Sequence, residues 1–267
     1  MPFASLDSII ASVASGNGEN SSFAKNSITT TAGRFYSLWA SGGLPAAGST
    51  PATGAGAAPT NATQGAIKFT SPSGSNKKHV LRMSVMGPTA GAVFLYDRLV
   101  HTSGLSGTVT TAQTVNSTAL TRYTDAVGVM CAIEVYSQLG SSSVTATISY
   151  TNQDGTSGRT GTITIPTTAL VGEFIGPMSL QGTDTGVQSV QTVTLSGSTG
   201  TAGNFGITLY KDLCRVPYNA NTVEERDMVL QLMNLPEVKS GACLALYSYA
   251  TTTSLGLQLG EIGMAQG

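Results

Sequence analysis

The two histidines of the chain are the first candidates for metal or acid–base chemistry. His79 follows two lysines, and His101 follows an apolar pair. A zinc site needs several His or Cys ligands at short, characteristic spacings, and neither histidine has such a neighbour. The sequence therefore predicts no metal site, and we expect each histidine to be an ordinary strand or loop residue.

The three cysteines are the next candidates, as nucleophiles or as disulfide partners. Cys131, Cys214 and Cys243 are widely separated, odd in number and flanked by apolar residues. Apolar flanks are typical of a thiol that acts as a small buried hydrophobe. We therefore expect three reduced, buried cysteines in a protein made in a reducing compartment.

Evenly spaced glycines near residue 200 resemble a phosphate-binding loop at first sight. Gly197, Gly200, Gly203 and Gly206 recur at every third position. A phosphate site would need a helix start or a lysine directly after them, and neither follows. The pattern instead indicates a glycine-rich loop that joins two strands.

Carboxylates are sparse and lie in turn-like contexts. A pair of them could serve as the acid and base of a glycosidase, but that depends on a separation that only a structure gives. The nucleophile elbow, the P-loop and the zinc-protease motif do not occur in the sequence. We therefore expect no enzyme, no catalytic residue and no cofactor. The aspartates in these turn-like contexts are Asp97, Asp125, Asp154 and Asp184.

The charge content excludes two classes of partner. The chain has 13 Lys+Arg and 14 Asp+Glu, so 10% of its residues are charged, against about 25% in a typical soluble domain. A net charge of −1 gives no basic surface for nucleic acid, and no apolar run approaches the ~20 residues of a membrane span. Two explanations of the scarce charge stay open: a surface of Ser, Thr, Asn and Gln, or a surface covered by neighbouring copies.

The elements that must position any site are mostly strands. From residue 66 onward, short β-branched and aromatic runs alternate with Gly, Pro and Ser clusters. The clearest hairpin covers residues 144–166, where apolar and polar residues alternate on both sides of Asp154-Gly155. About ten short strands predict an all-β protein with a β-sandwich, jelly-roll or barrel architecture.

Two helices are expected beside the strands. Residues 4–15 place Leu6, Ile9, Ile10 and Val13 on one stripe, with Asp7 in the first turn and a glycine after the end. A helix of three turns is not stable alone in water, so its stripe must dock on its own domain or on a neighbour. Residues 221–236 carry helix start and stop signals and predict one late structural helix.

The segment between the first helix and the strands indicates an extended arm. Residues 34–39 concentrate aromatic side chains, including the single tryptophan, and residues 42–59 are small residues and prolines with little to bury. We therefore divide the chain into an N-terminal helix and arm, residues 1–65, and a β-sandwich domain, residues 66–267. The expected partner-binding residues are Leu6, Ile9, Ile10, Val13, Phe35, Tyr36, Leu38 and Trp39.

Several segments carry a resemblance to a known class of proteins. They are ISYTNQDGTSGRT (148–160), FIGPMSL (174–180), GVQSVQTVTL (186–195), GTAGNFGITLYKDL (200–213), the opening MPFASLD and RFYSLW (34–39). Together they resemble virion structural proteins of tailed bacteriophages over the middle third and the N-terminus. Their motifs are turn and strand residues, so the resemblance implies a kind of protein and no particular site.

The resemblance implies a non-enzymatic virion protein that is made in the host cytoplasm. The favoured role is capsid cement or decoration on the head shell, bound to the major capsid protein or other virion subunits. We expect a homo-oligomer, with a trimer as one option. The alternative is a tail component, or a jelly-roll module of the virion that binds a receptor or carbohydrate.

Overall fold

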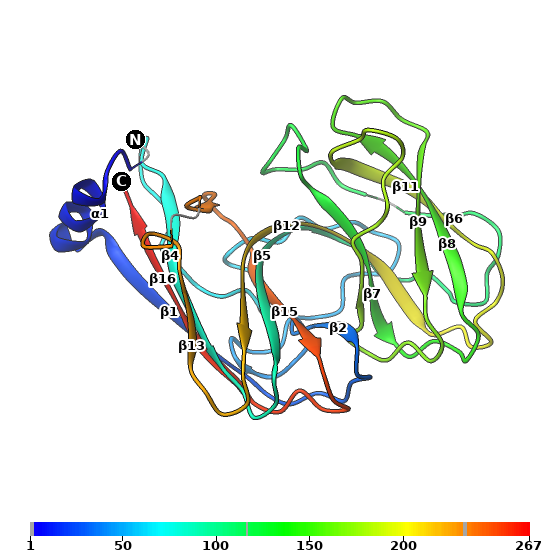
Figure 1. Ribbon diagram of the computed structural model, residues 1–267. Coiled ribbons are helices and arrows are strands. Elements are labelled where there is room, and N and C mark those ends of the chain that lie inside the picture. The colour runs from blue at the N-terminus through cyan, green and yellow to red at the C-terminus, as the bar shows by residue number, and fades with distance from the viewer. Residues whose placement is uncertain (1–2, 116, 232–233) are drawn as a thin grey trace.

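The computed structural model describes residues 3–115, 117–231 and 234–267. Within them the regular structure is almost entirely β-strand, with a short helix α1 (Leu6–Ser12) that continues into a π-helical turn η1 (Val13–Asn17). The predicted all-β, sandwich-like class is confirmed. Three sheets lie side by side, as Figure 1 shows.

The middle sheet closes on itself. A β-bridge joins Tyr36 to Glu173, and the Ser37 amide donates to the Gly172 carbonyl at 2.7 Å, so the two outermost strands meet. The result is a narrow closed barrel, which we call the central barrel. Its strand order is β10 (Phe174–Ile175), β7 (Met130–Ser137), β12 (Asn204–Tyr218), β5 (Gly91–His101), β15 (Leu244–Ala250) and β2 (Arg34–Ser37).

Aromatic side chains fill the inside of the central barrel. Successive residues of a strand point to opposite faces, so alternate residues of each strand point inward. Phe174 stacks on Tyr247 with 4.9 Å between ring centroids, and Tyr210 lies edge-on to Phe174 and Tyr96. These contacts join β5, β10, β12 and β15 across the interior, which leaves no open channel between those rings.

Two further sheets pack on opposite flanks of the central barrel (Figure 1). The terminal sheet contains the first and last strands of the chain and runs β13 (Glu224–Asp227), β4 (Lys78–Met86), β16 (Gln258–Gln266), β1 (Gly18–Lys25) and β3 (Gly43–Leu44), with β14 (Glu237–Val238) also on β4. The distal sheet runs β6 (Gln113–Thr114), β11 (Val187–Leu195), β8 (Val144–Asn152) and β9 (Arg159–Ile165). The predicted hairpin at 144–166 is the β8–β9 pair.

Strand β12 contributes to both flanking cores because its register shifts. Phe205 and Leu209 pack in the core under the distal sheet, whereas Val216 and Tyr218 pack under the terminal sheet. In the first half of β12 the side chains that point out of the central barrel belong to odd-numbered residues, and in the second half they belong to even-numbered residues. A β-bulge moves every following side chain to the other face, and β12 shifts its register against β5 between Asp212 and Cys214.

The expected boundary at residue 65 is corrected by the structure. Strand β1 pairs along its length with β16, and β2 pairs with β15, so residues from both sides of the boundary share the same sheets. Residues 42–59 are extended, as expected, but run along the chain's own surface, where Ala57 bridges to His101. Composition shows that a segment is flexible in isolation, and it does not show which surface holds it.

The predicted late helix is also wrong within the described residues. Glu224–Asp227 form β13, which pairs antiparallel with β4, and residues 228–231 form a turn. Residues 232–233 lie outside the described part of the chain. The start and stop signals are genuine local preferences, but pairing with the edge of the terminal sheet replaces the helix in this segment.

Deletion of residues 1–60 should abolish cooperative folding. It removes the three strands β1, β2 and β3 and the buried side chains of Phe23, Tyr36 and Trp39. Circular dichroism and thermal unfolding of the truncated protein test this. A matched deletion of residues 1–12 removes one buried apolar side chain, Ile9, and should leave a cooperative β-protein. A soluble, cooperatively unfolding 61–267 fragment would restore the original boundary.

Candidate functional site

The N-terminal helix presents most of its apolar stripe to solvent. Ser5 caps the helix and forms a capping box with Ser8, which fixes the helix start. Ile9 is buried, whereas Leu6, Ile10 and Val13 are 50%, 57% and 46% exposed. The helix is fastened through its end, where the Ser12 hydroxyl donates to the Gln266 carbonyl. Three of the four predicted helix residues are therefore free for a partner.

The predicted aromatic partner residues lie inside the chain instead. Tyr36, Leu38 and Trp39 are at most 2% exposed, and Phe35 is half-buried against Phe94. The Trp39 indole donates to the Ser49 carbonyl at 2.9 Å. The expectation that this group contacts neighbouring subunits is corrected, because such side chains fill a dry core as well as they fill an interface.

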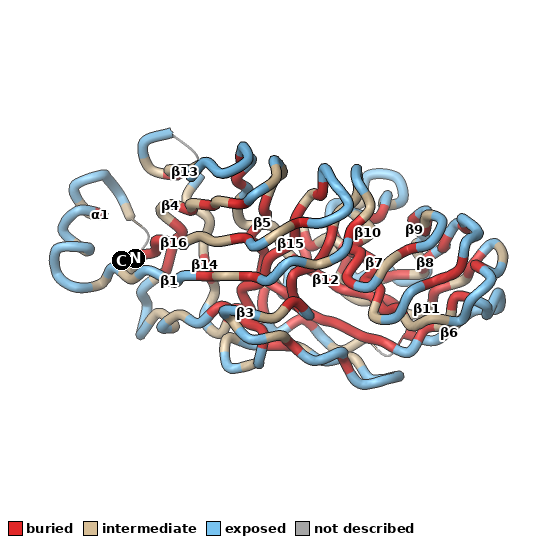
Figure 2. Tube along the Cα trace, turned by 90° about the horizontal axis from the view of Figure 1, so that it is seen from below, coloured by how far each residue is buried: buried red, intermediate tan, exposed pale blue. Residues whose placement is uncertain are grey.

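The exposed apolar side chains gather around the terminal sheet. Ten large apolar residues of the described chain are exposed, and seven of them belong to α1, η1, β3 or segments beside β13 and β16. Figure 2 shows α1 and the turn after β13 projecting outward beyond the sheet. The seven are Leu6, Ile10, Val13, Leu44, Val223, Leu230 and Leu257.

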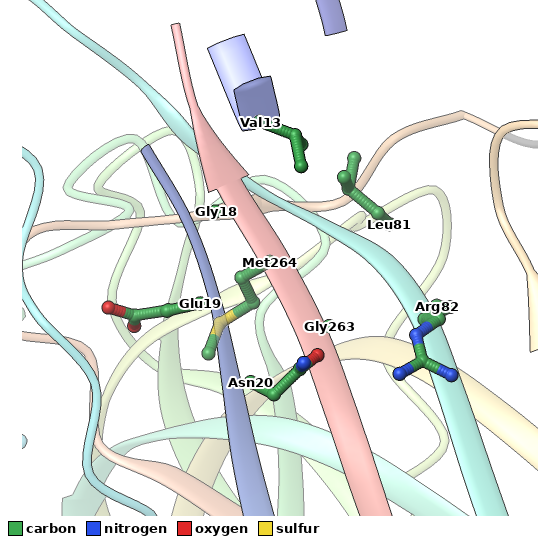
Figure 3. Close-up of a pocket in the computed structure, with 8 residues that line it drawn as sticks. All are labelled: Val13, Gly18, Glu19, Asn20, Leu81, Arg82, Gly263 and Met264. Atoms are coloured by element: carbon green, nitrogen blue, oxygen red, sulfur yellow. The ribbon is translucent and has the colours of Figure 1, made fainter. Parts of the chain in front are cut away.

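The outer face of the terminal sheet, formed by the outward side chains of β1, β16, β4 and β13, carries a groove of about 430 Å³ below η1. Figure 3 shows Val13 and Leu81 close together at one end of it, with Asn20, Gly263 and Arg82 following across the strands. A Cβ at Gly263 would lie 2.8 Å from Cγ of Arg82. The glycine therefore lets the arginine stem lie low against the sheet.

An ion triad crosses the middle of the same outer face. The Arg82 guanidinium donates to Glu225 at 2.9 Å and to Glu261 at 3.4 Å, and all three side chains are at least 40% exposed. Exposed ion pairs of this kind add at most about 1 kcal/mol to stability. The triad therefore contributes charge pattern to the surface more than it contributes folding energy.

A second groove, of about 490 Å³, separates α1 from the turn after β13. Leu6 and Ile9 line one wall, and Met228, Leu230 and Leu235 line the other. The groove is apolar, and Asp7 is the single charged residue of α1. The sequence predicts a helix over residues 221–236 and gives no sign that Met228, Leu230 and Leu235 line a groove.

The most strongly perturbed charges lie inside the central barrel. Arg98 donates to Glu134 at 2.5 Å, and both side chains are buried. Burial disfavours ionisation of Glu134, but the charge of Arg98 and donated hydrogen bonds outweigh it and hold the pKa of that carboxyl below its usual value. The guanidinium also donates to His101 and lies 4.7 Å from the Trp39 ring centroid.

This interior pair has the character of a structural element. Burial next to Arg98 lowers the pKa of His101 to about 3, so the ring stays neutral and accepts the arginine hydrogen bond. Arg98 and Glu134 each have several hydrogen-bond partners. Neither residue, and none of these partners, lines either of the two surface grooves. The expectation that His101 is an ordinary strand residue is met by its place at the end of β5.

The described residues hold the candidate chemical groups apart. Among them no three His, Cys, Asp or Glu side chains converge on a metal-sized site, and no helix is long and apolar enough to span a membrane. The three cysteines are free thiols, and burial raises the pKa of each to about 12. Gly197, Gly200 and Gly203 lie in the loop that joins β11 to β12, as expected, whereas Gly206 lies within β12.

Comparison with known proteins gives little further information. No family model and no curated protein matches the chain. A solved structure of infectious bursal disease virus, Gt strain, is 12% identical with a TM-score of 0.22, over 94% of this chain and 81% of the other. The VP2 subviral particle of that virus gives 11% and 0.20, over 93% and 80%. Similarity this low carries no argument about function, and the resemblance to tailed-bacteriophage proteins stays a prediction.

Replacing Trp39 by alanine should lower the free energy of unfolding by about 3–5 kcal/mol, because it empties a buried site above Arg98. Leu6→Ala, at a half-exposed position, should change it by less than about 0.5 kcal/mol. Urea titration followed by circular dichroism measures both. Equal losses in the two variants would contradict the placement of Trp39.

Asp212 should make stability depend on pH. Burial raises its pKa to about 6, although Tyr247 donates to it at 3.0 Å. Because the pKa is raised, the folded state favours the protonated acid. The contribution of Asp212 to the free energy of unfolding is therefore fully present below pH 4 and is lost as the pH rises through 6. A pKa raised from its ordinary value to about 6 corresponds to roughly 2–3 kcal/mol of folding free energy.

The isosteric variant Asp212→Asn isolates this effect. It should match the wild type near pH 4 and exceed it in stability near pH 7.5, because the amide has no charge to bury. Thermal unfolding midpoints across this pH range provide the measurement. A constant difference between the two proteins at all pH values would show that Asp212 does not titrate in this window.

Proposed function

We propose that this chain is a non-enzymatic structural protein of a virus particle, which is held in place by contacts with neighbouring subunits. The observation that carries the proposal is the gathering of seven exposed apolar side chains on α1 and around the terminal sheet. Exposed apolar side chains that gather in one region of a protein typically mark a protein–protein contact. Full burial of an exposed side chain of this size contributes about 1.5–3 kcal/mol, so a half-exposed one contributes about half as much when a partner covers it.

The low charge of the chain supports the same proposal. Only 27 of its 267 residues are charged, and several of these are consumed in buried pairs such as Arg98–Glu134 and Arg122–Asp97. The remaining surface carries few charges, which suits a protein that is surrounded by other subunits. The bacteriophage resemblance of residues 148–213 supports the finer proposal of a cement or decoration protein on the capsid.

The alternative of a carbohydrate-binding module receives less support. Such modules bind sugars on exposed aromatic platforms, and here the single tryptophan is 1% exposed. Tyr96, Tyr210 and Phe174 likewise face the inside of the central barrel. An assembly role uses the surface that the chain does expose.

Binding to particles tests the proposal. Particles that lack the protein are incubated with purified wild type, and the bound fraction is separated on a density gradient. We expect saturable binding, weakened at least tenfold by the double variant Leu6→Ser/Ile10→Ser at unchanged thermal stability. The matched control Val127→Ser/Val171→Ser changes two exposed residues elsewhere and should bind as the wild type does. Absence of wild-type binding would overturn the proposal.

A further inference from the structure

The outer face of the terminal sheet is ordered in four rows that run across the strands. The pairing registers β1–β16, β16–β4 and β4–β13 place outward residues in line, because alternate residues of each strand share a face. Each row is given in the strand order β1, β16, β4, β13. The first row is Gly18, Ala265 and His79, and the second is Asn20, Gly263, Arg82 and Asp227. The third row is Ser22, Glu261, Ser84 and Glu225, and the fourth is Ala24, Leu259 and Met86, with Val223 beside them.

The second and third rows are complementary in size. Arg82 stands in line with Gly263 in the second row, and Ser84 stands in line with Glu261 in the third. From the second row to the third, β4 therefore changes from a long side chain to a short one, and β16 changes from a short side chain to a long one. A rotation that exchanges the two rows places each long central side chain over a short one.

The first and fourth rows are complementary in polarity and height. The first row combines the small residues Gly18 and Ala265 with the buried His79, and it is walled by η1, where Val13 would lie 3.3 Å from a Cβ at Gly18. The fourth row is apolar, and a shallow groove of about 320 Å³ runs through Met86, Val223 and Leu259. The two rows lie equally far from the line between the second and third rows, about 10 Å at 3.4 Å per residue.

From this pattern we infer that the outer face binds a second copy of the same chain, face to face, about a two-fold axis that lies in the interface, perpendicular to the strands and between the second and third rows. This inference rests on the proposed function in that it names the partner of the exposed surface. Two sheets can stack at about 10 Å with nearly aligned strands. A two-fold contact must use one self-complementary patch, as this face provides.

Charge favours this occupant over an unrelated protein. The rotation sets Arg82 over the second copy's Ser84, which lies between that copy's Glu225 and Glu261 in the third row. Each arginine therefore approaches two carboxylates of the other chain and keeps its own two, at 2.9 and 3.4 Å. Arginine is suited to this arrangement because its planar fork can donate to several oxygens at once.

The same rotation covers the exposed helix. Val13 stands at the level of the first row, so it meets the fourth row of the second copy, where Met86, Leu259 and Val223 are apolar. Figure 2 shows α1 lying beyond the sheet, and its exposed residues Leu6 and Ile10 extend this contact. The helix of each chain thus clamps the opposite end of its partner, which explains why α1 exposes its stripe.

Sedimentation equilibrium on the full chain tests the pairing. We expect a reversible dimer in the wild type and at least a tenfold higher dissociation constant for Arg82→Glu, as for Glu225→Arg/Glu261→Arg. Mixing these two variants should restore a dimer, because residue 82 of each chain then faces residues 225 and 261 of opposite charge in the other chain. Asp154→Arg, an exposed turn residue of the distal sheet, is the matched control and should dimerise as the wild type does. Circular dichroism and thermal midpoints check that each variant folds.

A cross-linking experiment tests the register of the pairing. Val13→Cys mixed with Met86→Cys should give a covalent dimer with a short bis-maleimide, and Val13→Cys mixed with Val127→Cys should not.

A wild type that stays monomeric at high micromolar concentration would overturn the inference. So would a dimer that is insensitive to the charge variants, since it would use another surface, as would the absence of the Val13–Met86 cross-link. Particle binding by a monomeric protein would overturn the pairing and leave the proposed function in place. A dimer that does not bind particles would overturn the proposed function and leave the pairing in place.

Discussion

Closure of the central barrel is the constraint on which the other layers depend. The hydrogen bond from Ser37 to Gly172 and the bridge between Tyr36 and Glu173 remove both edges of the middle sheet. Each of its strands then has one face inside the barrel and one face outside it. The outside faces are wide enough to carry a separate sheet on either flank, so one set of strands supports three cores. This explains why the N-terminal residues, which supply β2, cannot be an independent arm.

Closure also explains the buried ion pair. Inside a narrow barrel, Arg98 and Glu134 are removed from water, and their desolvation is offset only if nearly every donor and acceptor is used. Tyr96, Tyr136 and Thr208 provide those partners, and Trp39 covers the guanidinium. Removing one member of such a buried pair typically costs 3–5 kcal/mol, since it leaves the other charge unpaired. The pair therefore opposes any slip of β5 relative to β7, and we assign it that role in fixing the register.

The sequence predicted what is local and missed what depends on distant pairing. Alternation over 144–165 identified β8 and β9, and the capped stripe at 4–15 identified α1, because both signals are contained in one segment. The assignment of the aromatic residues at 34–39 to a partner was wrong, since the strand that pairs with them is more than 200 residues away in the chain. Residues 224–227 show the opposite failure. Their helix-like signals are overridden by the free edge of β4, which no local pattern reveals.

The outer face of the terminal sheet is set by the core beneath it. Phe23, Met83 and Ile262 point into that core, so their neighbours on each strand must point outward, and the small and charged residues fall into rows. A slip of one residue would exchange the two sets, and the buried phenylalanine, methionine and isoleucine prevent it. The register shift at Leu81 extends this logic, since the additional residue rises toward Val13 and closes the upper end of the face. The surface pattern that a second copy would recognise is thus fixed by the same side chains that stabilise the fold, so it does not have to be selected independently of folding.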